Sequence, residues 1–281
     1  MKKITFQSLL LLGVISFSFN SCKKEEPDTE TQSSTDNSLC EGEFSRIFPE
    51  ANGFAISEPG VHRIGYNAPV PPSPLLCGTV TIDTANAFPV TVTIDYGSGC
   101  QGNDGKTRQG QLIVVVSNSW DSIGTTITIT PQNYSVTTGS GTPVSYSGTI
   151  TITKTSALSH SFKVTNGKCW NASWTILWEC DRTITQTAGS STIINPFDDE
   201  YQVYGTAHGT NRDGKIFDVN VPSSDPLVRK MSCQWISDGI FELTPEGLET
   251  RTVDFGTPNN GACDDKATLI IKGNKFEFTI Q

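Results

Sequence analysis

The sequence has little of what most enzymes and helical proteins are built from. Of its 281 residues only 17% are charged, three are His and two are Met. It contains no His-Glu-x-x-His zinc motif, no Gly-x-Ser-x-Gly nucleophile elbow and no glycine-rich phosphate turn opening a helix. No stretch of ten or more residues shows a clean apolar period of 3.6 residues. We therefore expect a chain that is not an enzyme and has no cofactor and no metal site, with the Asp/Asn-rich loops serving turns rather than calcium.

Positive charge is also scarce. The chain has 20 Lys and Arg against 29 Asp and Glu, a formal net charge of −9. Two of the lysines, Lys2 and Lys3, lie in an N-terminal leader whose removal would leave −11. A field of this sign repels the phosphate backbone, so we expect no nucleic acid among the partners.

What the sequence has in abundance favours β structure. It contains 35 Thr and 28 Ser, and many segments alternate apolar and polar residues in the period-2 manner of half-buried strands. We expect an all-β fold of about a dozen antiparallel strands in hairpins and meanders, forming a sandwich-like or elongated sheet. The alternating runs are Thr79–Asp83, Val90–Asp95, Leu112–Val116, Thr125–Thr130, Thr149–Thr153, Tyr201–Tyr204, Ile216–Val221, Ala267–Ile271 and Phe276–Ile280, with turns at 139–141, 166–167, 213–214 and 273–274.

Short internal similarities suggest two related halves. Thr-Ile-Asp-Tyr-Gly before Cys100 is similar to Thr-Val-Asp-Phe-Gly before Cys263. The β-rich region, expected over residues 40–281, divides on this basis into candidate halves 40–155 and 156–281. Common hairpin chemistry is the alternative explanation.

The N-terminus has the pattern of an export signal. Lys2 and Lys3 precede a mostly apolar run that is too short and too interrupted to span a bilayer, so residues 1–21 are expected to be a signal peptide. Ser21-Cys22-Lys23-Lys24 resembles the lipobox region of Bacteroidota lipoproteins. That resemblance implies that Cys22 becomes the first mature residue and carries fatty acids such as palmitate, which anchor the chain in a membrane. An ordinary signal peptide with an incidental Cys is the alternative.

The residues after Cys22 are polar and acidic. Residues 22–39 are expected to form a flexible tether, because 27–38 contain no large apolar side chain. Lys23-Lys24-Glu25-Glu26 is similar to the signal that sends such lipoproteins to the outer surface of the outer membrane. The alternative is a solvated linker that carries no sorting signal.

Seven cysteines follow Cys22, and an exported chain favours disulfides over zinc. Hairpin symmetry predicts Cys77–Cys100 and Cys233–Cys263, the first about residues 88–89 and the second about Gly247–Leu248. Cys169–Cys180 is a third candidate that requires a turn near 171–173. Cys40 is the cysteine left over.

Over about residues 77–281 the chain resembles a group of Bacteroidota outer-membrane lipoproteins that has no assigned activity. The residues that carry the likeness are Asp199-Glu-Tyr201, the Gly-Thr-Asn-Arg-Asp-Gly-Lys run at 209–215, the Tyr/Phe-Gly-(x)-Cys-Asp pattern at 253–264 and the closing Ala-Thr-Leu-Ile-Ile-Lys-Gly-Asn-Lys-Phe-Glu-Phe. The resemblance implies a β fold and an envelope location.

Trp170, Trp174 and Trp178 recur every four residues, which would place them on one face of a straight strand. They are candidate glycan contacts, with burial in the core as the alternative. Two functions are thus expected: a non-catalytic envelope lipoprotein that acts as a surface interaction or structural module with an envelope protein as partner, or a glycan-binding accessory lipoprotein of a polysaccharide-uptake system. An enzymatic interpretation would require a pocket that joins His208 to acidic residues.

Overall fold

The computed structural model describes residues 28–57, 77–83, 88–102, 105–192, 196–233, 235–257 and 259–279. The signal peptide and Cys22 lie outside these ranges. Within them the chain forms one long helix, one short 3-10 helix and sixteen strands. The helices are α1 (Gln32–Ser57) and η1 (Pro196–Asp198), and the strands are β1 (Thr79–Asp83), β2 (Val90–Asp95), β3 (Cys100–Gln101), β4 (Lys106–Val116), β5 (Thr126–Thr138), β6 (Val144–Lys154), β7 (Ser159–Trp170), β8 (Thr175–Ala188), β9 (Glu200–Thr210), β10 (Ile216–Val221), β11 (Leu227–Lys230), β12 (Ile236–Asp238), β13 (Ile240–Pro245), β14 (Arg251–Asp254), β15 (Lys266–Ile271) and β16 (Asn274–Thr279).

All the strands belong to one open antiparallel sheet. Its order is β1-β2-β4-β5-β6-β7-β8-β9-β10-β13-β14-β15-β16, with β3 beside β4 and with β11 pairing both β9 and β12. Strands that follow one another in sequence are mostly neighbours in space, the arrangement of a meander. The expected all-β class is confirmed, and the sheet is elongated rather than a sandwich.

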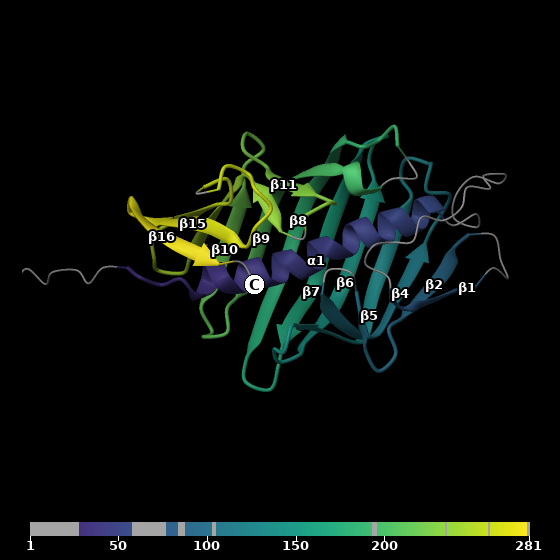
Figure 1. Cartoon of the computed structure of the whole chain (residues 1–281), viewed down its shortest axis with the longest axis horizontal. Coiled ribbons are helices and arrows are strands. Elements are labelled where there is room, and N and C mark those ends of the chain that lie inside the picture. The colour runs from purple at the N-terminus through teal and green to yellow at the C-terminus, as the bar shows by residue number, and fades with distance from the viewer. Residues whose placement is uncertain are drawn as a thin grey trace, which may run out of the picture.

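The alternation in the sequence determines which face of the sheet is buried. In β8, Ile176 and Trp178 are fully buried, whereas Leu177 and Glu179, which alternate with them, are exposed. This is the half-buried pattern expected when one face of a sheet is covered and the other meets water. Figure 1 shows that α1 covers one face of the sheet.

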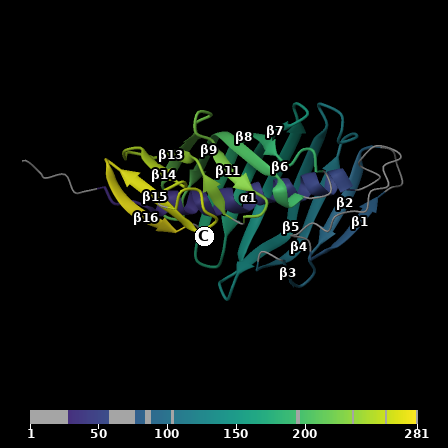
Figure 2. The same cartoon turned by 45° about the horizontal axis from the view of Figure 1, so that its top comes forward.

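Helix α1 is the main departure from the sequence prediction. Residues 28–39 were expected to be part of a flexible tether, but α1 begins at Gln32 and lies lengthwise across the strands, from the β15–β16 end towards the β2–β4 end (Figure 1). Figure 2 shows the same course from a second direction. The helix escaped prediction because most of its buried side chains are polar, and a tether and a polar helix have the same composition.

The two candidate halves are not separate units. The boundary at residues 155–156 falls in the hairpin between β6 and β7, which pair from Lys154↔His160 to Ser145↔Trp170. The sheet therefore runs without interruption through the proposed division.

The predicted turns at 139–141, 213–214 and 273–274 connect consecutive strands, whereas 166–167 does not. Asn166 and Gly167 lie inside β7, where the pairing with β8 shifts between Val164 and Gly167. Asn166 has a φ of 52°, a left-handed conformation that asparagine tolerates. The pair forms a β-bulge rather than a chain reversal.

Two of the three predicted disulfides are confirmed. Cys77 bonds to Cys100 with a Cα–Cα distance of 5.8 Å, and Cys233 bonds to Cys263 at 5.5 Å. In the second case β13 and β14 pair symmetrically about Gly247, as the hairpin argument requires.

The third predicted disulfide, Cys169–Cys180, is wrong. The expected turn is present, since the Asn171 amide donates to the Trp174 carbonyl. It places Cys169 opposite Ile176, while Cys180 pairs with Val164 beyond the bulge. Cys40 is not isolated either, because its Sγ lies 2.8 Å from that of Cys169.

Candidate functional site

A line of ion pairs joins the segment 28–47 to the sheet. At its start Arg251 of β14, whose side chain is fully buried, binds Asp28 and Glu30 at N–O distances of 2.9 and 2.7 Å. One turn into α1, Asp36 accepts from Arg212, which follows β9, with 2.8 Å between Nε and Oδ1. Ion pairs thus bind the start of this segment to the sheet, and the first buried apolar side chain in the segment is Leu39.

The middle of the helix carries the most deeply buried pair. Glu41 Oε2 lies 2.6 Å from Nη2 of Arg182 on β8, and the two side chains are 2% and 1% exposed. Nη1 of Arg182 also donates to the Gly205 carbonyl at 2.6 Å. A charge pair so far from water is stable only when both members are present, because either one alone would be buried without compensation.

Glu43 lies in a strongly basic environment. Tyr134 donates to its Oε1 at 3.0 Å, and Lys106 Nζ lies 3.5 Å from its Oε2. Burial by itself raises the pKa of Glu43, but the positive charges of Lys106, Arg108 and Arg46, with the Tyr134 hydrogen bond, outweigh it and hold that pKa below its ordinary value. Glu43 is therefore ionised at neutral pH.

Apolar packing reinforces the charged contacts. The Phe44 ring stacks on Trp178 of β8, with centroids 5.4 Å apart and an interplanar angle of 5°. The Trp178 indole Nε1 donates to Asn37 Oδ1 at 2.8 Å. Because Cys40, Phe44 and Ile47 are buried at spacings of four and three, they form a short apolar stripe on the helix.

Beside the helix the structure contains a cavity of about 500 Å³, within the range of small-molecule sites. We call it the Trp174–Trp235 cavity. It lies between α1, the strands β4 to β6 and the loops after β7, β9, β11 and β14. Its lining is Leu39, Lys106, Val136, Thr138, Gly141, Thr142, Val144, Tyr146, Asn171, Trp174, Arg212, Trp235 and Asp265.

Local hydrogen bonds hold Trp174 in place. Asn171 Oδ1 accepts from the backbone amides of Ser173 and Trp174, which fixes the turn before β8. The guanidinium of Arg212 lies over the Trp174 ring, 4.5 Å from its centroid, and Asp36 orients that guanidinium. A carboxylate of the docked helix therefore helps to shape the cavity wall.

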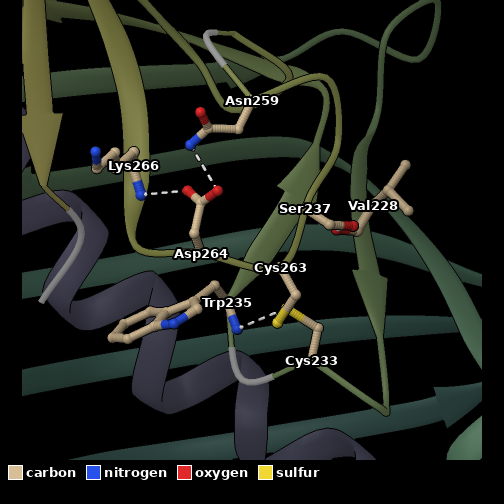
Figure 3. Close-up of a disulfide and its surroundings, with 8 residues drawn as sticks. All are labelled: Val228, Cys233, Trp235, Ser237, Asn259, Cys263, Asp264 and Lys266. Carbon is tan, nitrogen blue, oxygen red and sulfur yellow. Dashed lines mark hydrogen bonds between the residues drawn. A yellow bond between two sulfur atoms is a disulfide. The ribbon is translucent and has the colours of Figure 1, made fainter.

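A disulfide positions the opposite wall. Figure 3 shows Cys233–Cys263 joining the two loops that carry Trp235 and Asp264, with the Trp235 amide donating to Cys233 Sγ. Asp264 accepts from Asn259 and from the Lys266 amide in the same view. These contacts fix the loop from which Asp265 reaches the cavity.

Tyr146 of β6 supplies an aromatic surface to the cavity. Its ring meets Phe44 edge to face at 5.8 Å. Burial raises the pKa of Tyr146 well above its ordinary value, so the phenol stays protonated at neutral pH. A protonated phenol is able to donate a hydrogen bond.

The candidate platform of three tryptophans does not form, and the alternative of burial in the core holds for Trp178. Trp178 is fully buried beneath α1, and Trp174 lines the cavity. Trp170 ends β7 next to the inward-pointing Cys169, so alternation directs it to the opposite face, where Lys168 lies 4.8 Å from its ring centroid. The even spacing does not place the three on one face, because the hairpin turn falls between Trp170 and Trp178.

His208 lies on the outer face of the sheet. Its Nδ1 is 2.7 Å from Asp218 Oδ1, with side chains 59% and 75% exposed, at an open depression of about 320 Å³ that Glu179 and Asp181 also line. Cys180 also borders the depression. In β8 it lies between Glu179 and Asp181, so its side chain points to the opposite, buried face of the sheet. Burial also raises the pKa of the Cys180 thiol, which does not favour a nucleophile. The depression thus brings His208 together with acidic side chains, and His208 forms a cross-strand hydrogen-bonded pair with Asp218.

The basic residues facing α1 were missed by sequence reasoning. Arg182, Arg212 and Arg251 lie far apart in sequence, and nothing local marks them as partners of an acidic segment. The one local signal for the helix is the i, i+4, i+7 spacing of Cys40, Phe44 and Ile47.

Comparison with protein-family models, with curated proteins and with solved structures found no match to this chain. Among the described residues no helix is long and apolar enough to cross a membrane. In the same ranges no group of three or more His, Cys, Asp or Glu side chains is arranged to hold a metal ion.

Proposed function

We propose that this chain is a non-catalytic lipoprotein of the cell envelope, anchored in the outer membrane through Cys22 and acting as an interaction or structural module at the cell surface. The observation that carries the proposal is the docking of the segment that follows the anchor. Asp28 and Glu30 bind the buried Arg251, and α1 continues from there along the sheet.

Chain length places the module close to its anchor. Asp28 is the sixth residue after Cys22, so the two are at most about 20 Å apart at 3.3–3.6 Å per residue. In this proposal the β13–β16 end of the sheet, which carries Arg251, faces the membrane, and the β1–β2 end is held away from it. Because the segment after Cys22 is bound to the sheet, the sheet is held at a fixed place relative to the anchor, as a structural module requires.

Metabolic labelling with a fatty acid tests the anchor. We expect label on the wild-type chain and none on Cys22→Ala, because the thioether requires that sulfur. Cys40→Ala is the matched control and should keep its label. Equal labelling of wild type and Cys22→Ala would contradict the proposal. Protease treatment of intact cells then tests exposure at the surface: the module should be cut, whereas a periplasmic control protein should not.

We propose glycan binding as the second candidate function, located at the Trp174–Trp235 cavity. Two indoles, the Tyr146 ring and the polar side chains of Asn171 and Asp265 line one space of suitable size. Aromatic faces with a few fixed polar groups are a combination that suits a sugar ring. The cavity replaces the flat tryptophan platform that sequence spacing suggested.

A glycan screen followed by titration calorimetry tests this candidate. For any glycan that binds, Trp174→Ala should weaken binding by about tenfold or more, a loss of roughly 1.4 kcal/mol or greater. Trp170→Ala, on the opposite face, should bind like wild type. Unchanged affinity in Trp174→Ala, with normal cooperative unfolding, would exclude this cavity as the binding site.

A further inference from the structure

Two buried cysteines meet where the helix crosses the centre of the sheet. Cys40 of α1 and Cys169 of β7 are separated by 129 residues in sequence, yet their Sγ atoms lie 2.8 Å apart. Both residues are completely buried. A disulfide bond is about 2.05 Å long, so a small movement of either side chain brings the sulfurs within bonding distance.

We propose that Cys40 and Cys169 form a third disulfide in the exported protein, which covalently closes α1 onto the sheet. The inference rests on the proposed function for its oxidising compartment. The oxidant is a disulfide, either of a protein oxidoreductase or of a small molecule such as oxidised glutathione. One cysteine attacks it as the thiolate, forming a mixed disulfide and releasing one thiol. The second cysteine then displaces the other thiol, so that two protein thiols are oxidised and one disulfide is reduced to two thiols.

The environment of the pair determines when exchange is possible. Burial raises the pKa of the Cys169 thiol, and the hydrogen bond with Cys40 raises it further. The reactive thiolate is therefore scarce once the helix is docked, and no oxidant reaches a fully buried sulfur. Exchange accordingly takes place while α1 is still loose, and docking then protects the finished bond from reduction.

The pairing also accounts for the odd number of cysteines. With Cys77–Cys100 and Cys233–Cys263 already bonded, Cys40–Cys169 leaves Cys180 as the thiol. Cys180 is opposite Val164 in the sheet. After burial, the charge of Glu41 raises the pKa of its thiol and that of Arg182 lowers it.

The bond would give the docked segment a mechanical role. A load on the lipidated terminus passes through residues 28–40 and, with the bond in place, directly into β7 at the centre of the sheet. Without the bond, only ion pairs and packing hold the helix. The anchor and the sheet would then move as one body.

Peptide mapping tests the inference. The wild-type protein is purified from the envelope in detergent, alkylated in denaturant without reductant, and cleaved with trypsin and with a protease that cuts after glutamate. The second cleavage, at Glu179, is needed because trypsin leaves Cys169 and Cys180 in one peptide. We expect a linked Cys40–Cys169 pair and an alkylated Cys180. Alkylation of all three, or a Cys169–Cys180 link, would overturn the inference.

The two hairpin disulfides serve as internal controls that separate this inference from the proposed location. If they form in the cell and Cys40–Cys169 does not, the inference fails while export stands. If all three are absent in the cell, the purified chain is refolded in a glutathione redox buffer. Formation of Cys40–Cys169 there supports the pairing and contradicts export, and its absence there overturns the pairing. A Cys180→Ser variant should form the same three bonds.

Discussion

Replacing Glu41 with alanine is expected to lower the free energy of unfolding by about 3–5 kcal/mol, the cost of leaving one member of a buried ion pair without the other. Arg182 is 1% exposed and its Nη2 has Glu41 as its carboxylate partner, so its charge has no access to water when the carboxylate is removed. Alanine is the best helix former and adds no local penalty to α1. Urea denaturation followed by tryptophan fluorescence measures the loss.

Two further variants test whether the loss comes from the buried charge pair. Asp181, the residue before Arg182, points to the outer face and pairs with Lys163, with side chains 58% and 49% exposed. Asp181→Ala is the matched control and should cost only about 0–1 kcal/mol. The double variant Glu41→Leu/Arg182→Met removes both charges and should be more stable than Glu41→Ala alone. If Glu41→Ala and Asp181→Ala lose the same amount, the docked position of α1 is contradicted.

Acidification is expected to destabilise the protein by up to about 3 kcal/mol through His160 alone. Burial, and next the charge of Lys154, lower the pKa of His160 from its ordinary value near 6.5 to about 4. The ring is stacked on buried Trp120, 5.3 Å away. Because the folded state binds the proton less readily than the unfolded state, stability is complete above pH 6.5 and is lost as the pH falls towards 4. Glu43, whose pKa is lowered from 4.5, adds its own loss at more acidic pH.

The His160→Phe variant isolates this contribution. Phenylalanine keeps an aromatic ring against Trp120 and takes up no proton, so its free energy of unfolding should vary less than that of wild type between pH 6.5 and 4. Parallel curves for wild type and His160→Phe across this interval would rule out the proposed role of His160. Denaturation at half-unit pH steps is sufficient to distinguish the cases.

Local pattern in the sequence was enough for much of the sheet. Period-2 alternation in runs such as Val90–Asp95 and Ile216–Val221 identifies half-buried strands, because each side chain's face follows from its position in the run. The hairpin argument found Cys233–Cys263 because the chain reverses once, at Gly247, between the two cysteines. It failed for Cys169–Cys180 because the β7 bulge and an early turn shift the register.

The candidate site was much less accessible to sequence reasoning. The Trp170, Trp174 and Trp178 spacing predicted one face, but a turn between strands sends Trp170 to the other side. Trp174, singled out as a candidate contact, lines the cavity, whereas Trp235 and Arg212 come from distant loops that only folding brings to it. Spacing along one strand carries no information about what a loop 38 or 61 residues away contributes.

The sequence by itself determined that the chain is β-rich, that its strands follow one another in hairpins, and that two hairpins are closed by disulfides, because each of these depends on residues near one another in the chain. Only the tertiary structure decided that residues 28–57 form a helix docked on the sheet rather than a tether. Taken alone, that segment is too polar to predict a packed helix. Asp36 and Glu41 are buried, and Asp28 and Glu30 are partly buried, because arginines from β8, β14 and the loop after β9 compensate their charge. That compensation exists only after the sheet has assembled.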